Sequence, residues 1–208
     1  MRVAGVVLAA GAGRRLGGPK ALVCSEDGRT FVQRAGELLI DSGCSPVLVT
    51  TGARARDVEA HLPAGAHAVH VPEWQSGPGA GLARVLRHPE LDHVDALLIT
   101  LVDLPHVTGR GVGDVLARAH RNAVVRAVER GRPGHPVLIG RDHFAAAARL
   151  SRDGRGLKDL LATASTVRVE VTGATRDVDR AGDLPAGARL PAALPPPPRG
   201  RARRHAPK

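Results

Sequence analysis

The chain has 208 residues, 43% of them hydrophobic, which suffices for one α/β domain with a buried core. It carries 30 Lys and Arg against 20 Asp and Glu, but only three aromatic residues, so it lacks the side chains on which nucleic-acid-binding modules stack bases, and we expect no nucleic-acid partner. The apolar run Val3–Ala12 is far shorter than the roughly 20 residues of a membrane span, so no membrane partner is expected. Two cysteines without CxxC spacing fit a reduced, cytoplasmic setting.

Short runs rich in Val, Ile and Leu predict the β-strands. Most of these runs lack alternation between apolar and polar residues, which is typical of strands covered on both faces of a sheet. The predicted strands are Val3–Leu8, Pro46–Thr50, His67–Val71, Ala96–Leu101, Ala123–Val128, Pro136–Ile139 and Val167–Val171.

Longer segments with helical periodicity separate these strands. The predicted helices are Phe31–Ser42, Ala53–His61, Gly79–Arg87, Gly111–His120, Arg141–Leu150 and Gly156–Ala164. The alternation predicts a single Rossmann-like, doubly wound α/β domain with a mostly parallel sheet. In such sheets ligands bind at the carboxyl ends of the strands, so the residues that follow each strand are the first candidates for a site.

A glycine-rich loop follows the first strand, with the sequence GAGRRLGGPK from Gly11 to Lys20. Glycines let backbone N–H groups wrap around an anion, and Arg15 and Lys20 supply positive charge, so the loop has the chemistry of a phosphate cradle. A flexible turn with solvated arginines is the alternative, but a turn needs one or two glycines rather than four.

The loop differs from two familiar phosphate-binding loops. The spacing of Gly11, Gly13 and Gly17 is one residue longer than the dinucleotide fingerprint G-x-G-x-x-G. A Walker loop requires Gly-Lys followed by a hydroxyl residue, whereas Pro19 interrupts that order here and Ala21 follows the lysine.

The stretch LAAGAGRRLGGPK instead resembles the L-A-A-G-x-G-x-R-x-G-x-x-K signature of the MobA-like NTP transferase family. Ala10 and Gly13 are similar to the molybdenum cofactor cytidylyltransferase branch rather than to the guanylyltransferase branch. The resemblance implies a fold like that of the nucleotide-diphospho-sugar transferases. It also implies nucleotide contacts from a set of loop residues: Leu8, Ala9, Ala10, Gly11, Ala12, Gly13, Lys20, Thr51, Gly52 and Gly77.

Carboxylates follow two of the later strands. Asp103 ends the run ALLITLVD, where it is well placed to hold Mg²⁺ on triphosphate oxygens. The resemblance implies that Asp179 is the second metal ligand, with Asp177 as the alternative, although Arg180 and Ala181 replace the usual Thr-Pro of the family. Both carboxylates could instead be solvated residues of capped turns.

The acceptor side is implied by the segment Gly134, His135 and Pro136, which is similar to the P-G-H-P-V motif of the cytidylyl-type members. Trp74 and Gly77 match a segment that contacts base and ribose in the family, whereas Gly81 replaces its usual serine. The segment from Ser151 to Leu161 resembles a further acceptor loop only in part.

The resemblance implies a Mg²⁺-dependent nucleotidyltransferase, with Arg15, Lys20 and Asp103 as its catalytic residues. The donor is an NTP, with CTP favoured, and the acceptor is an anionic small molecule such as molybdopterin. A molybdoenzyme that matures with the cofactor is a further partner. The alternatives are guanylyl transfer, transfer to a sugar phosphate or another small phosphate, and a non-catalytic protein that binds a cofactor or nucleic acid.

The end of the chain differs in composition from the rest. Residues 1–190 are predicted to form the nucleotidyltransferase domain. Residues 191–208 contain a proline run and five of the basic residues but no acid, so they are predicted to be a disordered tail.

Overall fold

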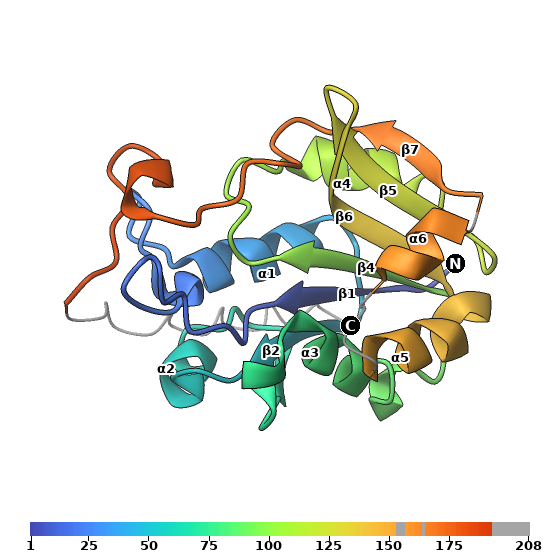
Figure 1. Ribbon diagram of the computed structural model, residues 1–208, viewed down its shortest axis with the longest axis horizontal. Coiled ribbons are helices and arrows are strands. Elements are labelled where there is room, and N and C mark those ends of the chain that lie inside the picture. The colour runs from blue at the N-terminus through green and yellow to red at the C-terminus, as the bar shows by residue number, and fades with distance from the viewer. Residues whose placement is uncertain (153–156, 164, 193–208) are drawn as a thin grey trace, which may run out of the picture.

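The computed structural model in Figure 1 describes residues 1–152, 157–163 and 165–192. One sheet holds all the described strands in the order β3-β2-β1-β4-β6-β5-β7, and every strand except β6 runs in the same direction. The strands are β1 (Val3–Leu8), β2 (Val47–Thr51), β3 (Ala66–His70), β4 (Ala96–Leu101), β5 (Val124–Glu129), β6 (Arg132–Gly140) and β7 (Val167–Glu170). The predicted mostly parallel α/β fold is confirmed.

Helices cover both faces of the sheet (Figure 1). Leu39 of α1 and Val112 of α4 belong to the hydrophobic cluster on one face, while Leu82 of α3, Ala147 of α5 and Leu160 of α6 belong to the cluster on the other. The helices are α1 (Phe31–Asp41), α2 (Ala55–Ala60), α3 (Pro78–Val85), α4 (Gly109–Leu116), α5 (Phe144–Arg152) and α6 (Lys158–Thr163). Their bounds differ from the predicted ones by a few residues.

The two-residue shift at the start of α4 has a local cause. The Thr108 hydroxyl accepts a hydrogen bond from the Gly111 amide at 3.3 Å, so the helix begins at Gly109 rather than at Gly111. Thr30 caps α1 in the same way by accepting a hydrogen bond from the Gln33 amide. Such caps satisfy amides that have no partner within the first helical turn.

The antiparallel strand β6 follows β5 after a two-residue turn. Arg130 and Gly131 have φ angles of 53° and 76°, and Glu129 pairs with Arg132 across the turn. Positive φ at both central residues is the geometry of a type I′ hairpin, which fits the twist of antiparallel strands. A connection this short cannot cross over to a parallel neighbour.

The order of the strands reverses between β1 and β4. From β1 the chain builds the sheet outward through β2 and β3, and later returns to place β4 on the other side of β1. In a doubly wound sheet a crevice opens at such a switch point, beyond the carboxyl ends of the two strands. The glycine loop follows β1 and Asp103 follows β4, so the fold brings both to this crevice.

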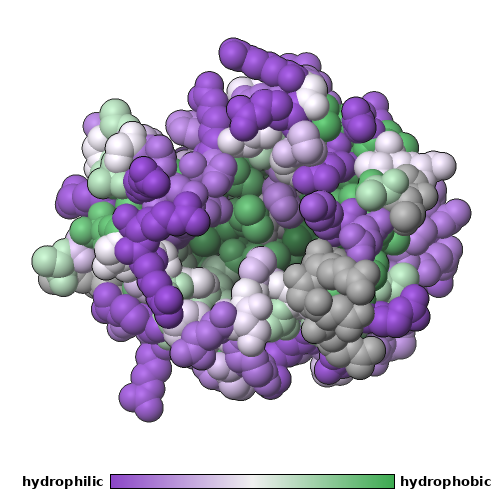
Figure 2. All heavy atoms as spheres, viewed as in Figure 1, coloured by the Kyte–Doolittle hydropathy of each residue, from purple (hydrophilic) through white to green (hydrophobic). Residues whose placement is uncertain are grey.

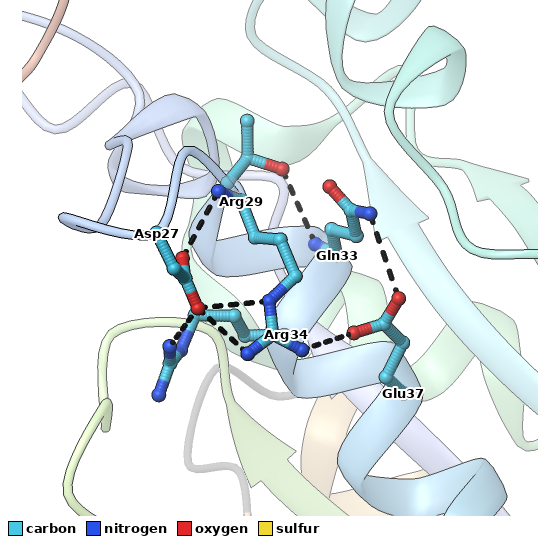
Figure 3. Close-up of polar contacts among 6 residues, drawn as sticks. Asp27, Arg29, Gln33, Arg34 and Glu37 are labelled. Atoms are coloured by element: carbon cyan, nitrogen blue, oxygen red, sulfur yellow. Dashed lines mark hydrogen bonds and ion pairs between the residues drawn. The ribbon is translucent and has the colours of Figure 1, made fainter. Parts of the chain in front are cut away.

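A network of charged residues braces the chain between the glycine loop and α1 (Figure 3). The Asp27 carboxylate accepts hydrogen bonds from the side chains of Arg29 and Arg34, and Arg29 also contacts Glu37 at 2.9 Å. Gln33 donates to Glu37 from the same helix. These half-exposed ion pairs tie the turn to the first two turns of α1.

The last described segment returns to the glycine loop. Arg189 and Cys24 exchange two backbone hydrogen bonds of 2.8 and 2.9 Å, and Leu190 packs against Gly18. Both cysteines are buried and free. Of the predicted tail, residues 193–208 lie outside the described residues. Within the described part of the chain, no helix is both long and apolar enough to cross a membrane.

Candidate active site

A cleft of about 290 Å³ opens at the switch point between β1 and β4. Figure 2 shows a hollow with a hydrophobic floor near the middle of this face, surrounded by hydrophilic side chains. The cleft is lined by Leu8, Ala9, Ala10, Gly11, Gly13, Lys20, Thr50, Trp74, Gly77, Pro78, Gly81, Leu101, Val102 and Asp103. Most of the predicted nucleotide contacts are therefore gathered around one cavity.

The glycine loop folds around a single carbonyl group. The amides of Leu16, Gly17 and Gly18 all donate to the Gly13 carbonyl, at 2.9 to 3.2 Å. Gly13 has a φ of +58°, and a Cβ atom placed on it would lie 2.0 Å from the Gly18 carbonyl oxygen. Glycine is therefore required at this position by both backbone conformation and space.

The first half of the loop has unpaired amides. Within the described residues, the backbone amides from Ala10 to Arg15 donate to no acceptor. A run of consecutive amides without partners forms a concave anion-binding surface when the backbone curves around it. The loop can therefore supply several N–H donors to phosphate oxygens.

Thr50 on β2 fixes the start of the loop. Its buried hydroxyl accepts a hydrogen bond from the Ala9 amide at 2.9 Å. A Cβ atom on Gly81 would lie 3.3 Å from the Thr50 side chain, so the small residue in α3 leaves space beside this contact. The next residue, Thr51, was the predicted nucleotide contact, but it does not line the cleft because its hydroxyl donates to Glu59 at 2.8 Å.

Asp103 and Asp179 are joined by one lysine. The Lys20 ammonium group lies 2.6 Å from Asp103 Oδ2 and 2.5 Å from Asp179 Oδ1. The exposed Arg15 guanidinium also contacts Asp179, at 2.7 Å. The four charged side chains predicted for catalysis and metal binding thus form one continuous cluster, although only Lys20 and Asp103 line the cleft and Arg15 and Asp179 lie outside its lining.

Backbone contacts place Asp179 opposite Asp103. The Val178 amide donates to the Asp103 carbonyl at 3.0 Å, which joins the last loop to the end of β4. Asp183 then accepts from the amides of Asp179 and Arg180 and fixes the turn. Between the two carboxylates that the sequence left open, Asp179 contacts Lys20, whereas Asp177 is exposed.

The cluster shifts the pKa values of its members in opposite directions. Burial raises the pKa of the Asp103 carboxyl, although the hydrogen bond from Lys20 opposes this shift. The hydrogen bond from Lys20 lowers the pKa of Asp179. Burial alone would lower the pKa of Lys20, but hydrogen bonds to both carboxylates together raise it, so the lysine is held as a cation.

The residues present fit a hard divalent cation. Asp103 Oδ1 is buried without a hydrogen-bond partner, which leaves one carboxylate oxygen free inside the cleft. Carboxylate oxygens are the ligands that Mg²⁺ prefers, and Mg²⁺ commonly takes one or two of them together with substrate phosphates. No group of three His, Cys, Asp or Glu side chains converges in the described residues, so further ligands would come from a substrate or water.

A second cavity of about 370 Å³ adjoins the first and shares Leu8, Pro78 and Leu101 with it. His135 lines this cavity, as the acceptor prediction requires, whereas Gly134 and Pro136 do not. Gly134 is needed for another reason, because a Cβ atom there would lie 2.1 Å from the carbonyl oxygen of Ala174. The small residue thus admits a neighbouring backbone segment rather than a ligand.

Two predicted glycines shape the wall near Trp74. A Cβ atom on Gly52 would lie 2.6 Å from the Trp74 side chain, so Gly52 supports the tryptophan and does not itself line the cleft. Gly77, with a φ of 99°, turns the chain into α3 and lines the cleft. Ala12 lies outside the lining residues as well.

Reasoning from the sequence missed Thr50 and Arg126, whereas Lys158 belongs to the acceptor loop suggested between Ser151 and Leu161. Thr50 borders the nucleotide cleft, and the other two border the second cavity. Arg126 was detectable as the one charged residue within the apolar run Ala123–Val128. Of the acceptor loop suggested between Ser151 and Leu161, residues 153–156 lie outside the described residues.

Comparisons with known proteins identify the family of the chain. The model of the MobA-like NTP transferase domain matches residues 5–169. A protein named nicotine blue oxidoreductase from Paenarthrobacter nicotinovorans is 36% identical over 66% of this chain and 70% of its own length. A probable molybdenum cofactor guanylyltransferase from Rhodopirellula baltica is 30% identical over 56% of this chain and 54% of its own length, so the match spans about half of that relative.

Solved structures with the same fold include that of Rv0371c from Mycobacterium tuberculosis. It superposes with a TM-score of 0.75 at 26% identity, over 88% of this chain and 95% of that one. A further crystal structure of Rv0371c, at 25% identity and a TM-score of 0.72 over 88% of this chain and 96% of that one, is a complex with manganese. The chain belongs to the MobA-like NTP transferase domain family, and it is a nucleotidyltransferase.

Proposed function

We propose that the protein transfers a nucleoside monophosphate from an NTP to a phosphate-bearing small molecule and releases pyrophosphate. The observation that carries this proposal is a cleft lined by a glycine loop with free amides and by Asp103, which Lys20 bridges to a second carboxylate, Asp179. Such a site holds a polyphosphate between N–H donors on one side and a cation on the other.

The reaction requires one bond to form and one to break. An oxygen of the acceptor phosphate attacks the α-phosphorus of the NTP. The bond between that phosphorus and the oxygen that bridges to the β-phosphorus then breaks, and its electron pair leaves with pyrophosphate. No covalent intermediate with the protein is needed, so positioning and electrostatic stabilisation supply most of the acceleration.

Each charged residue has a role in this scheme. The loop amides bind non-bridging phosphate oxygens, while Lys20 and Arg15 exchange their carboxylate contacts for contacts with the departing pyrophosphate. A compact ammonium group suits the partly buried position of Lys20, and the exposed Arg15 can follow the product outward. Asp103 and Asp179 are then free to hold a divalent cation.

We propose Mg²⁺ as that cation, since the site offers only hard oxygen ligands. When bound, Mg²⁺ neutralises charge on the phosphate oxygens and lowers the barrier to displacement. The residues that would hold it are Asp103, through its unpartnered Oδ1, and Asp179. The manganese in the related structure supports a divalent metal at this kind of site.

We propose CTP as donor and molybdopterin as acceptor, with a molybdoenzyme as the protein that receives the product. Ala10 and Gly13 in the loop favour the cytidylyl-type branch, whereas the relative named a probable guanylyltransferase favours GTP. Both relatives of that type carry molybdenum cofactor in their names, which supports a molybdopterin acceptor.

A turnover assay tests this proposal. The protein is incubated with Mg²⁺, molybdopterin and each of the four common NTPs labelled at the α-phosphate, and pyrophosphate and labelled product are both measured. We expect release of one pyrophosphate for each labelled product, fastest with CTP, and none after addition of EDTA. If labelled product forms only with GTP, the donor is GTP rather than CTP, and the reaction is still nucleotidyl transfer.

The relative named an oxidoreductase supplies the sharpest alternative outcome. Absence of labelled product with every NTP, with or without molybdopterin, would overturn the proposed transfer. Measurement of NADH and NADPH oxidation in the presence of an added redox dye, with the same protein sample, would then show whether the protein catalyses an oxidoreductase reaction.

A further inference from the structure

Arg126 carries the strongest unexplained charge in the second cavity. It lies on β5, and its side chain lines the cavity on the face of the sheet that α5 and α6 cover. The neighbouring residues Val125 and Ala127 pack into the hydrophobic cluster on the opposite face. Because side chains alternate between the two faces of a strand, Arg126 points to the face opposite Val125 and Ala127. That face is covered by α5 and α6, where an apolar side chain would be expected.

The guanidinium of Arg126 has no partner in the described residues. Its Nε is buried without a hydrogen bond, and no carboxylate there lies within ion-pair distance of the group. The closest charge in register is another cation, the exposed Arg168 on β7. Burial and Arg168 both lower the pKa of Arg126, which reflects a cation held in an unfavourable place.

An unpaired, partly buried cation destabilises a fold unless something compensates it. The remaining polar residues of the cavity do not do so. His135 contacts the Ile99 carbonyl at 3.4 Å, and Lys158 is a further cation at the exposed rim. Among the described residues, the cavity thus presents positive charge and no counterion, which suits an anionic ligand.

The register of the sheet separates Arg126 from the metal-binding carboxylates. Arg126, Val137 and Ile99 lie in one row across β5, β6 and β4. Asp103 follows the end of β4 at Leu101, two strands across from Arg126, so the Cα atoms of Arg126 and Asp103 are at least about 12 Å apart, given strand spacings near 4.8 Å and a rise of about 3.3 Å per residue as far as Leu101. The arginine cannot bind the phosphate that reacts beside Asp103.

The cavity wall between these two ends is apolar. Leu8, Leu82, Ile99, Leu101, Val137, Leu157 and Leu161 line it, together with Pro78. An elongated ligand that reaches from the nucleotide cleft to Arg126 must therefore place an apolar or aromatic section against these side chains.

We propose that Arg126 binds a second acidic group of the acceptor, at the end opposite its reacting phosphate. The acceptor class is then an elongated molecule with a phosphate at one end, a flat or apolar middle section and an anionic group at the other end, which favours another small phosphate acceptor over molybdopterin, whose far end is an uncharged pterin. This inference rests on the proposed nucleotidyl transfer for the identity of the ligand as the acceptor, but the charge and shape of the cavity stand without it.

Two small probes test the proposal by calorimetric titration. The first is naphthyl phosphate, and the second is its carboxy derivative with the carboxylate at the far end of the ring system. Magnesium pyrophosphate is present to occupy the glycine loop. We expect the dianionic probe to bind the parent protein about tenfold more tightly than the first, because a desolvated guanidinium gains a carboxylate partner.

Two variants separate the role of Arg126 from a general effect of positive charge. Arg126→Gln should bind both probes equally, whereas Arg168→Gln, which removes an exposed cation from the same row, should keep most of the preference. Equal affinities in the parent, no binding of either probe, or a preference that survives in Arg126→Gln would overturn the proposal.

A parallel titration with CTP and Mg²⁺ distinguishes this inference from the proposed function. The parent and Arg126→Gln should bind the nucleotide with the same affinity, since Arg126 lies outside the nucleotide cleft. A protein that discriminates the probes but binds no NTP would disprove the transferase proposal alone. One that binds the NTP but not the probes would disprove the present inference alone.

Discussion

The two cavities differ in whether their charged side chains are paired. In the nucleotide cleft, Lys20 is paired with both Asp103 and Asp179, so the charges there compensate one another within the protein. In the second cavity, Arg126 is partly buried and has no counterion among the described residues. The first arrangement is stable without a ligand and can exchange partners when one arrives, whereas the second stays unfavourable until an anion binds.

The difference suggests that the nucleotide cleft carries out the reaction and that the second cavity selects the acceptor. The glycine loop and the carboxylates recognise features that every NTP shares, so they fit the reaction that defines the family. The second cavity is specific to what this chain must bind, because its charge and apolar walls suit a narrower set of molecules. Four sets of substitutions test whether the two cavities are independent in this way.

The largest effect is expected from Asp103→Asn in the nucleotide cleft. The amide keeps the size of the side chain but binds a cation more weakly, so turnover should fall by about 10²-fold or more. Steady-state pyrophosphate release measures this, with Asp177→Asn as the control, because Asp177 is an exposed neighbour in sequence of Asp179. An Asp103→Asn protein as active as the parent would remove the carboxylates from the mechanism.

A methyl group on Gly13 should damage the phosphate cradle more than one on Gly11. Alanine at Gly13 is strained by the positive φ and would collide with the Gly18 carbonyl, whereas a Cβ atom on Gly11 meets nothing within 4 Å. We expect Gly13→Ala to lose roughly 1–3 kcal/mol of unfolding free energy and to raise KM for the NTP. Urea unfolding and NTP kinetics that are the same for both variants would contradict the loop geometry.

Replacement of each cation by methionine should shift stability in opposite directions. Lys20→Met leaves the buried Asp103 carboxylate without its cation and should cost roughly 3 kcal/mol. Arg126→Met removes an unpaired charge and should leave stability unchanged or raise it by about 1 kcal/mol. Thermal and urea unfolding measure both, and a destabilised Arg126→Met would show that the arginine has a structural partner after all.

The smallest effect is a pH dependence in the second cavity. Burial lowers the pKa of His135 below its ordinary value of 6.5, so the folded protein binds fewer protons than the unfolded chain and stability is lost as the pH falls below that value. His135→Gln should flatten this loss by at most about 1.4 kcal/mol per pH unit. Urea titrations over a series of pH values test it, and parallel curves for parent and variant would contradict it.

The sequence predicted the sheet better than its connections. Apolar runs identify strands because burial on both faces demands them, and the runs from Val3, Ala96 and Val167 correspond to β1, β4 and β7. The direction of β6 was not anticipated, yet only seven residues separate the predicted strands Ala123–Val128 and Pro136–Ile139. That spacing is too short for a crossover and is typical of a hairpin.

Some residues of the site could likewise be predicted from the sequence and others could not. Residues that follow strands directly, such as Gly13 and Asp103, were predictable because the fold sends all such positions to one edge. Thr50 rather than Thr51 borders the cleft because adjacent strand residues face opposite sides, and the sequence does not say which side is which. The charged residue Arg126 is visible in the sequence, but its lack of a hydrogen-bond or ion-pair partner among the described residues is seen only in the three-dimensional packing.

A calorimetric titration of the protein with each common NTP in the presence of Mg²⁺ tests whether the glycine loop and Asp103 form a triphosphate site. We expect saturable heat with at least one NTP, strongest for CTP, and a large loss of that heat in Asp103→Asn and Gly13→Ala but not in Arg126→Gln. No heat with any NTP from a correctly folded parent protein would contradict this expectation.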